Sequence, residues 1–447
     1  MVRADLIRRL AELDILTPAA CFARLWLYFK ESGVTEGENL LRRRKIHPTR
    51  LEFLEGYPSP LSRTSQSLAS TLEKLAGRTT PAEFDAFGLR WLKSLDQVLK
   101  DSVFKSFARQ ETVADDSRIY KVRRRNAFLA EHYEALGKGV TWEAGQSRSL
   151  AAYCPFHTLV PDRVVDVRID VKPASAWGTP FLHSRLQEES SRLKILLWPL
   201  ETPIDYASLD ILKESPPPEF VSLRDVRNEE DLQRDVCKAL ETARSLEVTL
   251  LILPELAIPP AVETEIRRIL GSANHGRDGY PLLTLFGCCH QPAVVDSEVN
   301  EASLLGADGQ ELCRHRKLTS FTSYKRGGSI LAAECPQIGK TLSILESALG
   351  NLTPLICLDV FNSPLREVLS QSHGNLFVVP SLSPKTTAHR TAAGNLQASH
   401  RAGTFVCNRW IEGPAAGSFY QVPRPKGYSA RKSRGKPYLL YKLESAG

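Results

Sequence analysis

Three segments in the second half of the chain place a potentially reactive side chain at, or just after, a strand-like apolar run. Glu255 follows the run Leu250–Leu253, which Pro254 stops. Lys317 precedes a new loop, and Cys357 ends a short apolar strand. A thiol is a nucleophile, a carboxylate can serve as its base, and an ammonium can stabilise developing negative charge. Together these residue types could perform nucleophilic catalysis.

Taken singly, each of the three residues has an ordinary interpretation. A glutamate after a strand is usually a surface loop residue, and the basic cluster around Lys317 is typical of a solvated face. A cysteine within an apolar run is usually an inert core residue. The prediction of a catalytic site therefore depends on the three residues occurring together and in this order.

Their order and spacing resemble the carbon–nitrogen hydrolase (nitrilase/amidase) superfamily. The segment Asn300–Gly309 is similar to the strand–turn–strand that leads to the lysine of that family. Downstream of the cysteine, the residues that follow the order of the family are Asp359, Pro364, Arg366, Val378–Ser381 and Gln397–Asn408. The resemblance covers about residues 193–447, close to the length of one such domain.

The resemblance implies that Glu255, Lys317 and Cys357 form a catalytic triad. A thiol near its ordinary pKa is mostly protonated at pH 7, so Glu255 would take the proton of Cys357. Lys317 and the backbone N–H of Leu358 would stabilise the negative charge that attack on an amide or nitrile creates. The resulting thioester would be released by a water molecule that Glu255 activates. This chemistry requires no metal or organic cofactor.

The family often adds a second glutamate between the lysine and the cysteine, and this residue positions the substrate. Glu334 is the best placed candidate, although Glu346 also lies in the interval. The predicted function is hydrolysis of a non-peptide C–N bond in a small-molecule amide or nitrile. Nothing in the sequence identifies that substrate.

Several positions depart from the pattern of the family. Ala257–Pro260 stands where a loop with glycine and an aromatic residue is usual, and Leu358 stands where an aromatic residue usually follows the cysteine. Only Phe321 remains of the His-Leu-Phe sequence that commonly follows the lysine. These changes spare the triad and alter its surroundings, which favours an unusual substrate over loss of activity.

The pattern of the second half indicates the elements that would position these residues. Short apolar runs alternate with helical segments, which is typical of an α/β domain whose sheets are covered by helices. The runs are Leu193–Leu197, Val248–Leu253, Leu282–Phe286, Pro354–Cys357 and Leu376–Val379. The resemblance implies an α-β-β-α sandwich over residues 193–447. It also implies a homo-oligomer, because members of the family commonly dimerise through this domain.

The first part of the chain has a different pattern. Apolar residues recur at three- and four-residue intervals up to about Ala130, which predicts a mainly α-helical domain over residues 1–172. Arg163–Val171 alternates apolar and charged residues and is expected to be the strand that closes this region. Residues 173–192 have the composition of a linker.

The chain has 447 residues and a net charge of +7. Residues 1–192 hold 30 basic and 24 acidic side chains, against 28 and 27 in the remainder. Basic clusters lie at Arg42–Lys45, Lys121–Arg125 and Arg424–Lys436. The first two clusters motivate an alternative function, a catalytically silent nitrilase-like effector or scaffold whose basic N-terminal domain binds nucleic acid or a protein partner. The composition of the last cluster favours a solvated loop over a site for phosphate or nucleic acid.

Nine cysteines in 447 residues are an odd number at low density, which is typical of free thiols in a reducing compartment. The N-terminus lacks the apolar core of a secretory signal, and no apolar run is long enough to span a bilayer. The sequence therefore predicts a cytoplasmic protein with no membrane partner. Cys154–His157 and Cys288–His290 contain metal-ligand residue types, but neither has a second pair at zinc-site spacing, which favours core or strand positions.

Overall fold

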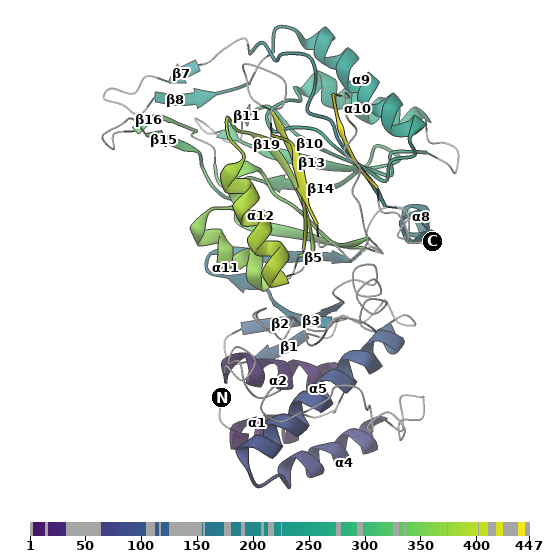
Figure 1. The fold of residues 1–447 in the computed structure, drawn as a ribbon, viewed down its shortest axis with the longest axis vertical. Helices are drawn as coiled ribbons and strands as arrows, with labels where there is room; N and C mark the ends of the chain where they lie inside the picture. The colour runs from purple at the N-terminus through teal and green to yellow at the C-terminus, as the bar shows by residue number, and fades with distance from the viewer. Residues whose placement is uncertain are drawn as a thin grey trace. The chain divides into compact units, whose positions relative to one another are not determined.

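The computed structural model divides the chain into two compact units, Met1–Arg163 and Val164–Gly447 (Figure 1). The structure describes residues 3–13, 17–32, 64–103, 112–115, 118–124, 154, 157–173, 180–188, 193–206, 210–212, 219–224, 226–273, 279–292, 298–324, 330–334, 337–347, 349–372, 374–400, 402–409, 417–422 and 437–442. The predicted basic clusters Arg42–Lys45 and Arg424–Lys436 lie outside the described residues. Among the described helices, none is long and apolar enough to cross a membrane.

The first unit is partly helical, as its periodicity predicts. Its described helices are α1 (Arg3–Ala11), α2 (Pro18–Glu31), α4 (Thr64–Ala76) and α5 (Pro81–Val103). Thr17 caps the N-terminus of α2, and its hydroxyl accepts a hydrogen bond from the Ala20 amide at 3.1 Å. Pro18 occupies the first helical turn, where its missing N–H costs nothing. Phe22 and Phe29 are fully buried in the core that α2 shares with the other helices.

A three-stranded antiparallel sheet completes the first unit. It consists, in spatial order, of β1 (Thr112–Asp115), β2 (Arg118–Arg124) and β3 (His157–Pro161). β2 therefore contains most of the predicted basic cluster Lys121–Arg125. Asp96 of α5 accepts hydrogen bonds from the His157 amide at 2.7 Å and from His157 Nδ1 at 3.1 Å, which attaches β3 to the helices.

The second unit begins earlier than the sequence indicates. β5 (Val167–Pro173), expected to close the helical domain, pairs in parallel with β17 (Thr341–Ser347) of the second unit. Within the predicted linker 173–192, residues Pro180–Glu188 form helix α8, and Arg185 donates a hydrogen bond to the Tyr280 hydroxyl at 2.9 Å. The partner of β5 lies far along the chain, so the local pattern gives no sign that this strand belongs to the second unit.

Two mixed sheets form the second unit. The six-stranded sheet has the order β14 (Glu311–Arg316), β13 (Glu301–Gly306), β10 (Leu283–Gly287), β9 (Leu250–Ile252), β6 (Lys194–Leu197) and β22 (Leu439–Lys442). The seven-stranded sheet has the order β21 (Phe419–Gln421), β20 (Gly403–Arg409), β19 (Leu376–Leu382), β18 (Gly350–Pro354), β17, β5 and β4 (Arg163–Val164). In the centres of both sheets, β6, β9 and β10 run parallel, as do β18, β19 and β20.

The two sheets pack face to face, and helices cover their outer faces (Figure 1). α9 (Glu229–Ser245) and α10 (Pro260–Ala273) cover the six-stranded sheet, while α12 (Thr387–His400) packs on β20 with α11 (Ser363–Ser372) beside it. This arrangement confirms the predicted α-β-β-α sandwich. It explains why the central strands are buried on both faces and read as continuous apolar runs.

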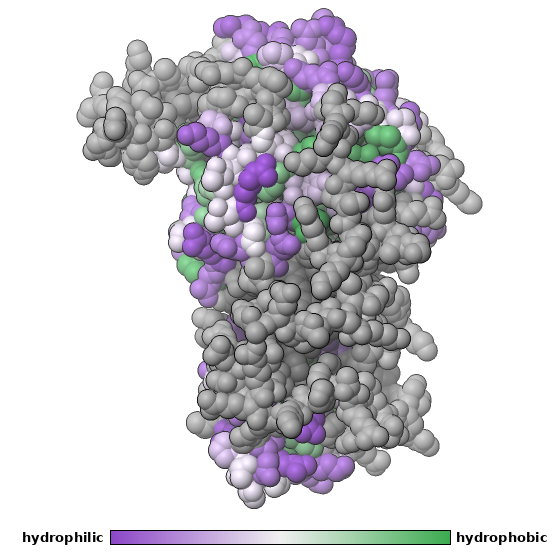
Figure 2. Space-filling model, in the orientation of Figure 1, coloured by the Kyte–Doolittle hydropathy of each residue, from purple (hydrophilic) through white to green (hydrophobic). Residues whose placement is uncertain are grey.

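The pattern of apolar and charged residues in α9 explains why this helix covers the six-stranded sheet. Leu232, Val236 and Leu240 recur at four-residue intervals and pack in one core cluster with Leu251 and Phe286 of the sheet. The exposed positions of α9 before its last residue are all charged: Glu230, Asp231, Arg234, Lys238, Glu241 and Arg244. The top of Figure 2, where α9 lies in Figure 1, is hydrophilic.

Two smaller sheets lie next to the sandwich. One has the order β15 (Thr322–Tyr324), β16 (Ile330–Ala333), β8 (Glu219–Ser222) and β7 (Asp210–Leu212), and the other pairs β11 (Gln291–Pro292) with β12 (Glu298–Val299). The antiparallel strands β15 and β16 connect the loop after Lys317 to Glu334. The pairing of these strands therefore returns the chain to the neighbourhood of Lys317.

Candidate active site

Glu255 lies in a turn just after β9, as the sequence predicts. The next residue, Leu256, has a φ of +54°, and its carbonyl accepts hydrogen bonds from the Tyr206 hydroxyl at 2.9 Å and from Cys289 Sγ at 3.5 Å. A Cβ on Gly287 would lie 2.5 Å from the Glu255 Cα, so only glycine allows β10 to approach this closely. The turn is thus held by packing and by hydrogen bonds.

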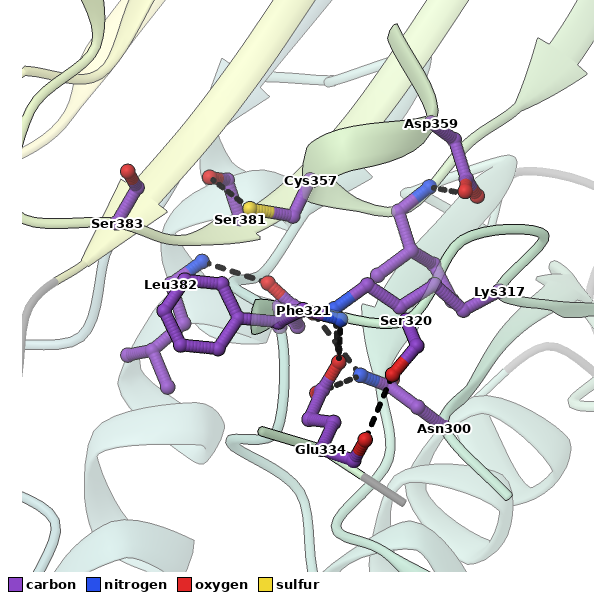
Figure 3. A network of polar contacts seen from close by, with 12 residues as sticks. Asn300, Lys317, Ser320, Phe321, Glu334, Cys357, Asp359, Ser381, Leu382 and Ser383 are labelled. Carbon is purple, nitrogen blue, oxygen red and sulfur yellow. Dashed lines mark hydrogen bonds and ion pairs between the residues drawn. The ribbon is translucent and has the colours of Figure 1, made fainter. Parts of the chain in front are cut away.

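Lys317 directly follows β14, at the end of the β13–turn–β14 unit. Its side chain is 2% exposed, and Nζ donates to Glu255 Oε1 at 2.8 Å and to Glu334 Oε2 at 2.7 Å. Asn300 Nδ2 donates to Oε1 of both glutamates at 2.9 Å. The two carboxylates are therefore joined by two shared donors, one ammonium and one amide, as Figure 3 shows in part.

Further contacts fix each carboxylate. Glu255 Oε2 accepts a hydrogen bond from the Leu382 amide at 2.9 Å, and Glu334 Oε2 accepts one from the Phe321 amide at 3.1 Å. His290 Nδ1 accepts a hydrogen bond from the Leu223 amide at 2.9 Å, so Nε2 carries the proton and faces Glu334 Oε1 at 3.4 Å. Each carboxylate is thereby held by donors on both oxygens.

Cys357 is not the last residue of a strand, which corrects the prediction for Pro354–Cys357. β18 ends at Pro354, and Cys357 begins a short 3-10 helix, η3 (Cys357–Val360). Its φ of +43° is unusual for a residue with a side chain and turns the backbone sharply. The first hydrogen bond of η3 is donated by the Asp359 amide to the Ile356 carbonyl, so the Leu358 amide precedes the bonded part of the helix.

Asp359 connects the cysteine turn to the lysine loop. Its carboxylate accepts hydrogen bonds from the Leu318 amide at 3.0 Å and from the Ile356 amide at 3.1 Å. His315 Nε2 lies 3.1 Å from Asp359 Oδ2, and both side chains are fully buried. One carboxylate therefore fixes the backbone next to Lys317 relative to the backbone next to Cys357 (Figure 3).

Cys357 is 6% exposed, and a hydroxyl group of the described residues contacts its thiol. Ser381 Oγ of β19 donates to Cys357 Sγ at 3.4 Å, and the same oxygen lies 3.2 Å from His389 Nε2 of α12. Figure 3 shows the Ser381 hydroxyl beside the sulfur.

The charges of the site are strongly interdependent. Burial lowers the pKa of Lys317, but the negative charges of Glu255 and Glu334 outweigh burial and raise it above its ordinary value. Burial raises the pKa of Glu334, and the charge of Lys317 and the contact with His290 outweigh it and lower that pKa. Burial, followed by the charge of Glu255, raises the pKa of the Cys357 thiol, while Lys317 and Ser381 oppose this increase. In the absence of substrate, the side chain of Cys357 is therefore a protonated thiol at neutral pH.

The structure brings Glu255, Lys317 and Glu334 into direct contact, and the charges of Glu255 and Lys317 act on the Cys357 thiol. Glu346, the other candidate for the second glutamate, lies half-buried in β17, opposite Asn351 of β18. The hydrogen bonds of Lys317 go to Glu255 and Glu334 instead.

Sequence reasoning missed several polar residues of the site. Asn300 begins the segment Asn300–Gly309, and Asp359 and Ser381 are among the downstream positions that follow the order of the family, so a signal for these three residues was present although their roles were not predicted. No pattern singles out His315 or His389, because their proximity to the site arises from tertiary structure.

The residues with metal-ligand chemistry have other partners. Cys288 Sγ contacts Glu263 and Ser303, and His290 is occupied by Leu223 and Glu334. No group of three or more His, Cys, Asp or Glu side chains within the described part of the chain is arranged to hold a metal ion.

Comparisons with known proteins give matches in structure only. No family model matches the chain, and no curated protein matches it. An amidase from Nesterenkonia sp. is 14% identical over 56% of this chain and 90% of its own, with a TM-score of 0.36. A mutant of the Nesterenkonia sp. AN1 amidase in complex with butyramide has the same identity and coverage, with a TM-score of 0.37.

The NitFhit protein of C. elegans is 15% identical over 57% of this chain and 61% of its own, with a TM-score of 0.41. The Nesterenkonia AN1 amidase is described as a member of the nitrilase superfamily. Over about half of its length, the chain is similar in structure to amidases of the nitrilase superfamily.

Proposed function

We propose that the second unit is a thiol-dependent hydrolase of a non-peptide C–N bond, with Cys357 as nucleophile. The observation that carries this proposal is the buried ammonium of Lys317 held between Glu255 and Glu334, with the charges of Lys317 and Glu255 acting on the Cys357 thiol. Burying three ionised groups is costly, so a site that keeps them together beside a thiol is a candidate for catalysis.

In the first step, Glu255 accepts the proton of Cys357 as the sulfur attacks the carbon of an amide or nitrile. For an amide, a C–S bond forms and the carbonyl electrons move to oxygen. Collapse of this intermediate breaks the C–N bond, and Glu255 returns the proton to the departing amine. A thioester on Cys357 remains.

In the second step, a water molecule attacks the thioester carbon. Glu255 removes a proton from the water, the C–S bond breaks, and the thiol recovers its proton as the carboxylic acid leaves. The carboxylate of Glu255 is held on both oxygens by Lys317, Asn300 and the Leu382 amide, which keeps it oriented during both proton transfers.

Lys317 supplies the positive charge that stabilises the intermediate. An ammonium has three donors, and two of them are used by Glu255 and Glu334. The third N–H is available for the oxyanion, together with the Leu358 amide. Glu334 anchors Lys317, and we expect it to contact the substrate as well.

The proposal is tested by intact-mass measurement after acid quenching with a panel of small amides and nitriles. We expect an acyl adduct on the wild type and none on Cys357→Ala. Glu255→Gln keeps the shape of the side chain and removes the base, so turnover should fall at least about a thousandfold because both proton transfers lose their acceptor.

Other buried cysteines of this chain provide internal controls. Cys288 and Cys407 are fully buried, whereas Cys357 is 6% exposed. Iodoacetamide should label Cys357 faster than either. The absence of an adduct across the panel, together with equal labelling of the three cysteines, would contradict the proposed function.

A further inference from the structure

A chain of three polar side chains connects helix α12 to the nucleophile. His389 Nε2 lies 3.2 Å from Ser381 Oγ, and Ser381 Oγ lies 3.4 Å from Cys357 Sγ. The exposed fractions of His389, Ser381 and Cys357 are 0%, 0% and 6%. Because water does not compete for buried groups, these hydrogen bonds are stronger than they would be at the surface.

The imidazole of His389 is fixed and neutral. The Phe361 ring at the end of η3 contacts it edge to face, with the ring centroids 4.7 Å apart. Burial lowers the pKa of His389 to about 4, so the ring carries no charge at pH 7. A neutral imidazole has one N–H, and the position of that hydrogen sets the direction of the chain.

The partners of the two ring nitrogens assign the hydrogen to Nε2. His389 Nδ1 is buried and has no hydrogen-bond partner among the described residues. A hydrogen on Nδ1 would leave a buried donor unpaired. With the hydrogen on Nε2, His389 donates to Ser381 Oγ, and the hydroxyl hydrogen of Ser381 is directed to the sulfur of Cys357.

We propose that His389 is a positioning residue for the nucleophile, which acts through Ser381 to keep a hydroxyl donor on Cys357 Sγ. This inference rests on the function proposed above. When Glu255 takes the thiol proton, the Ser381 hydroxyl stabilises the thiolate that forms. A hydrogen bond to an anion is stronger than one to a neutral thiol, so the Ser381 hydroxyl favours the Cys357 thiolate, which is the form that attacks the substrate.

Ser381 supplies the side-chain donor to this sulfur, and a hydrogen bond from the Leu382 backbone N–H also lowers the pKa of the thiol. The charge of Glu255, after β9, opposes the thiolate, and that of Lys317, after β14, favours it. Asp359 of η3 is directed at His315 and at two backbone amides, and Arg390 of α12 stacks on the Phe419 ring at 4.2 Å. Among the described residues, the only side-chain hydrogen bond to Cys357 Sγ that the structure shows comes from Ser381.

The test is the pH dependence of Cys357 alkylation by iodoacetamide in the full-length protein, located by peptide mass spectrometry. We expect Ser381→Ala and His389→Phe to slow alkylation about tenfold at pH 7 and to raise the midpoint by about one pH unit, as expected for the loss of one hydrogen bond to an anion. His389→Gln supplies an amide donor in place of Nε2–H and should retain most of the wild-type rate.

A double variant separates this role from a purely structural one. Because His389 acts through the hydroxyl, Ser381→Ala/His389→Phe should react no more slowly than Ser381→Ala alone. Leu396→Ala, at a buried position of the same helix, is the matched control and should lower thermal stability without moving the midpoint. Where His389→Phe folds poorly, Ser381→Ala and His389→Gln still report the pH profile.

The outcomes for the two proposals are distinct. Wild-type Cys357 that forms no acyl adduct and reacts no faster than Cys288 and Cys407 would overturn the proposed function. Selective alkylation of Cys357 with a pH midpoint that His389→Phe leaves unchanged would overturn the role of His389 alone. Additive effects in the double variant would also overturn it.

Discussion

At the scale of single residues, the site depends on a balance of buried charge. Lys317 lies between Glu255 and Glu334, each within 2.8 Å of its ammonium. Two carboxylates and one ammonium leave one negative charge, which the Asn300 amide and the Leu382 and Phe321 amides help to stabilise. The same ammonium therefore has a structural role and, in the proposed reaction, a catalytic one.

Replacing Lys317 by methionine should expose this dual role. The variant leaves two buried carboxylates without a cation, and we expect the free energy of unfolding at pH 7 to fall by about 3–5 kcal/mol. The lowered pKa of Glu334 means that its favourable contribution is present above its ordinary pKa and is lost as the pH falls. In the variant, burial should raise this pKa instead, so protonation near neutral pH relieves the repulsion.

Denaturant unfolding at pH 5 and pH 8 measures this effect. The stability difference between wild type and Lys317→Met should be larger at pH 8 than at pH 5. The double variant Lys317→Met/Glu334→Gln removes one of the two carboxylate charges and should recover part of the loss. Equal differences at the two pH values would show that the ammonium does not compensate these carboxylates.

At the scale of elements, the sandwich depends on polar contacts between layers as well as on apolar packing. Asp235 of α9 accepts hydrogen bonds from Trp198 Nε1 at 2.9 Å and from the amides of Glu201 at 2.5 Å and Thr202 at 2.8 Å. These donors belong to the segment after β6. One helix carboxylate therefore fixes the loop that leaves the six-stranded sheet.

Asp235→Ala should lower the free energy of unfolding by about 3 kcal/mol, because it leaves an indole and two backbone donors without their acceptor. Asp231→Ala is the matched control on the same helix, since Asp231 is exposed and pairs only with Arg234 among the described residues. We expect its effect to stay within about 0.5 kcal/mol. Denaturant unfolding of the two variants gives the comparison, and similar losses would contradict the role of Asp235.

Elements also explain what the sequence could predict. Glu255 could be found because Pro254 ends an apolar run next to it. The strands β6 and β9 lie within predicted runs, and β10 and β19 overlap such runs. The extent of the second unit could not be predicted from the sequence. Apolar and charged residues alternate in β5, but its partner β17 lies far along the chain. The role of His389 could not be predicted either, because a single histidine in a polar helix becomes part of the site only when α12 packs beside η3.

At the scale of the whole molecule, the distribution of charge distinguishes the N-terminal part of the chain. Residues 1–192 carry an excess of six basic side chains out of the net seven. The strand β2 contains three basic residues of one predicted cluster. A basic excess of this kind binds polyanions and releases their counterions, so the affinity decreases steeply as the salt concentration rises. We propose that this part of the chain binds nucleic acid weakly, independently of hydrolysis.

Gel shifts of the full-length protein with a DNA duplex, at about 50 and 200 mM salt, test this proposal. We expect binding at the lower salt concentration that decreases steeply at the higher one. Replacing Arg42, Arg43, Arg44 and Lys45 by glutamine should weaken binding and reduce the salt dependence. The matched variant removes four exposed basic residues of the second unit, Arg234, Lys238, Arg244 and Arg268, and so has the same net charge. Equal losses of binding in the two variants would mean that total charge, and not the N-terminal cluster, governs the binding of DNA. The absence of a gel shift at about 50 mM salt would exclude nucleic acid as the partner.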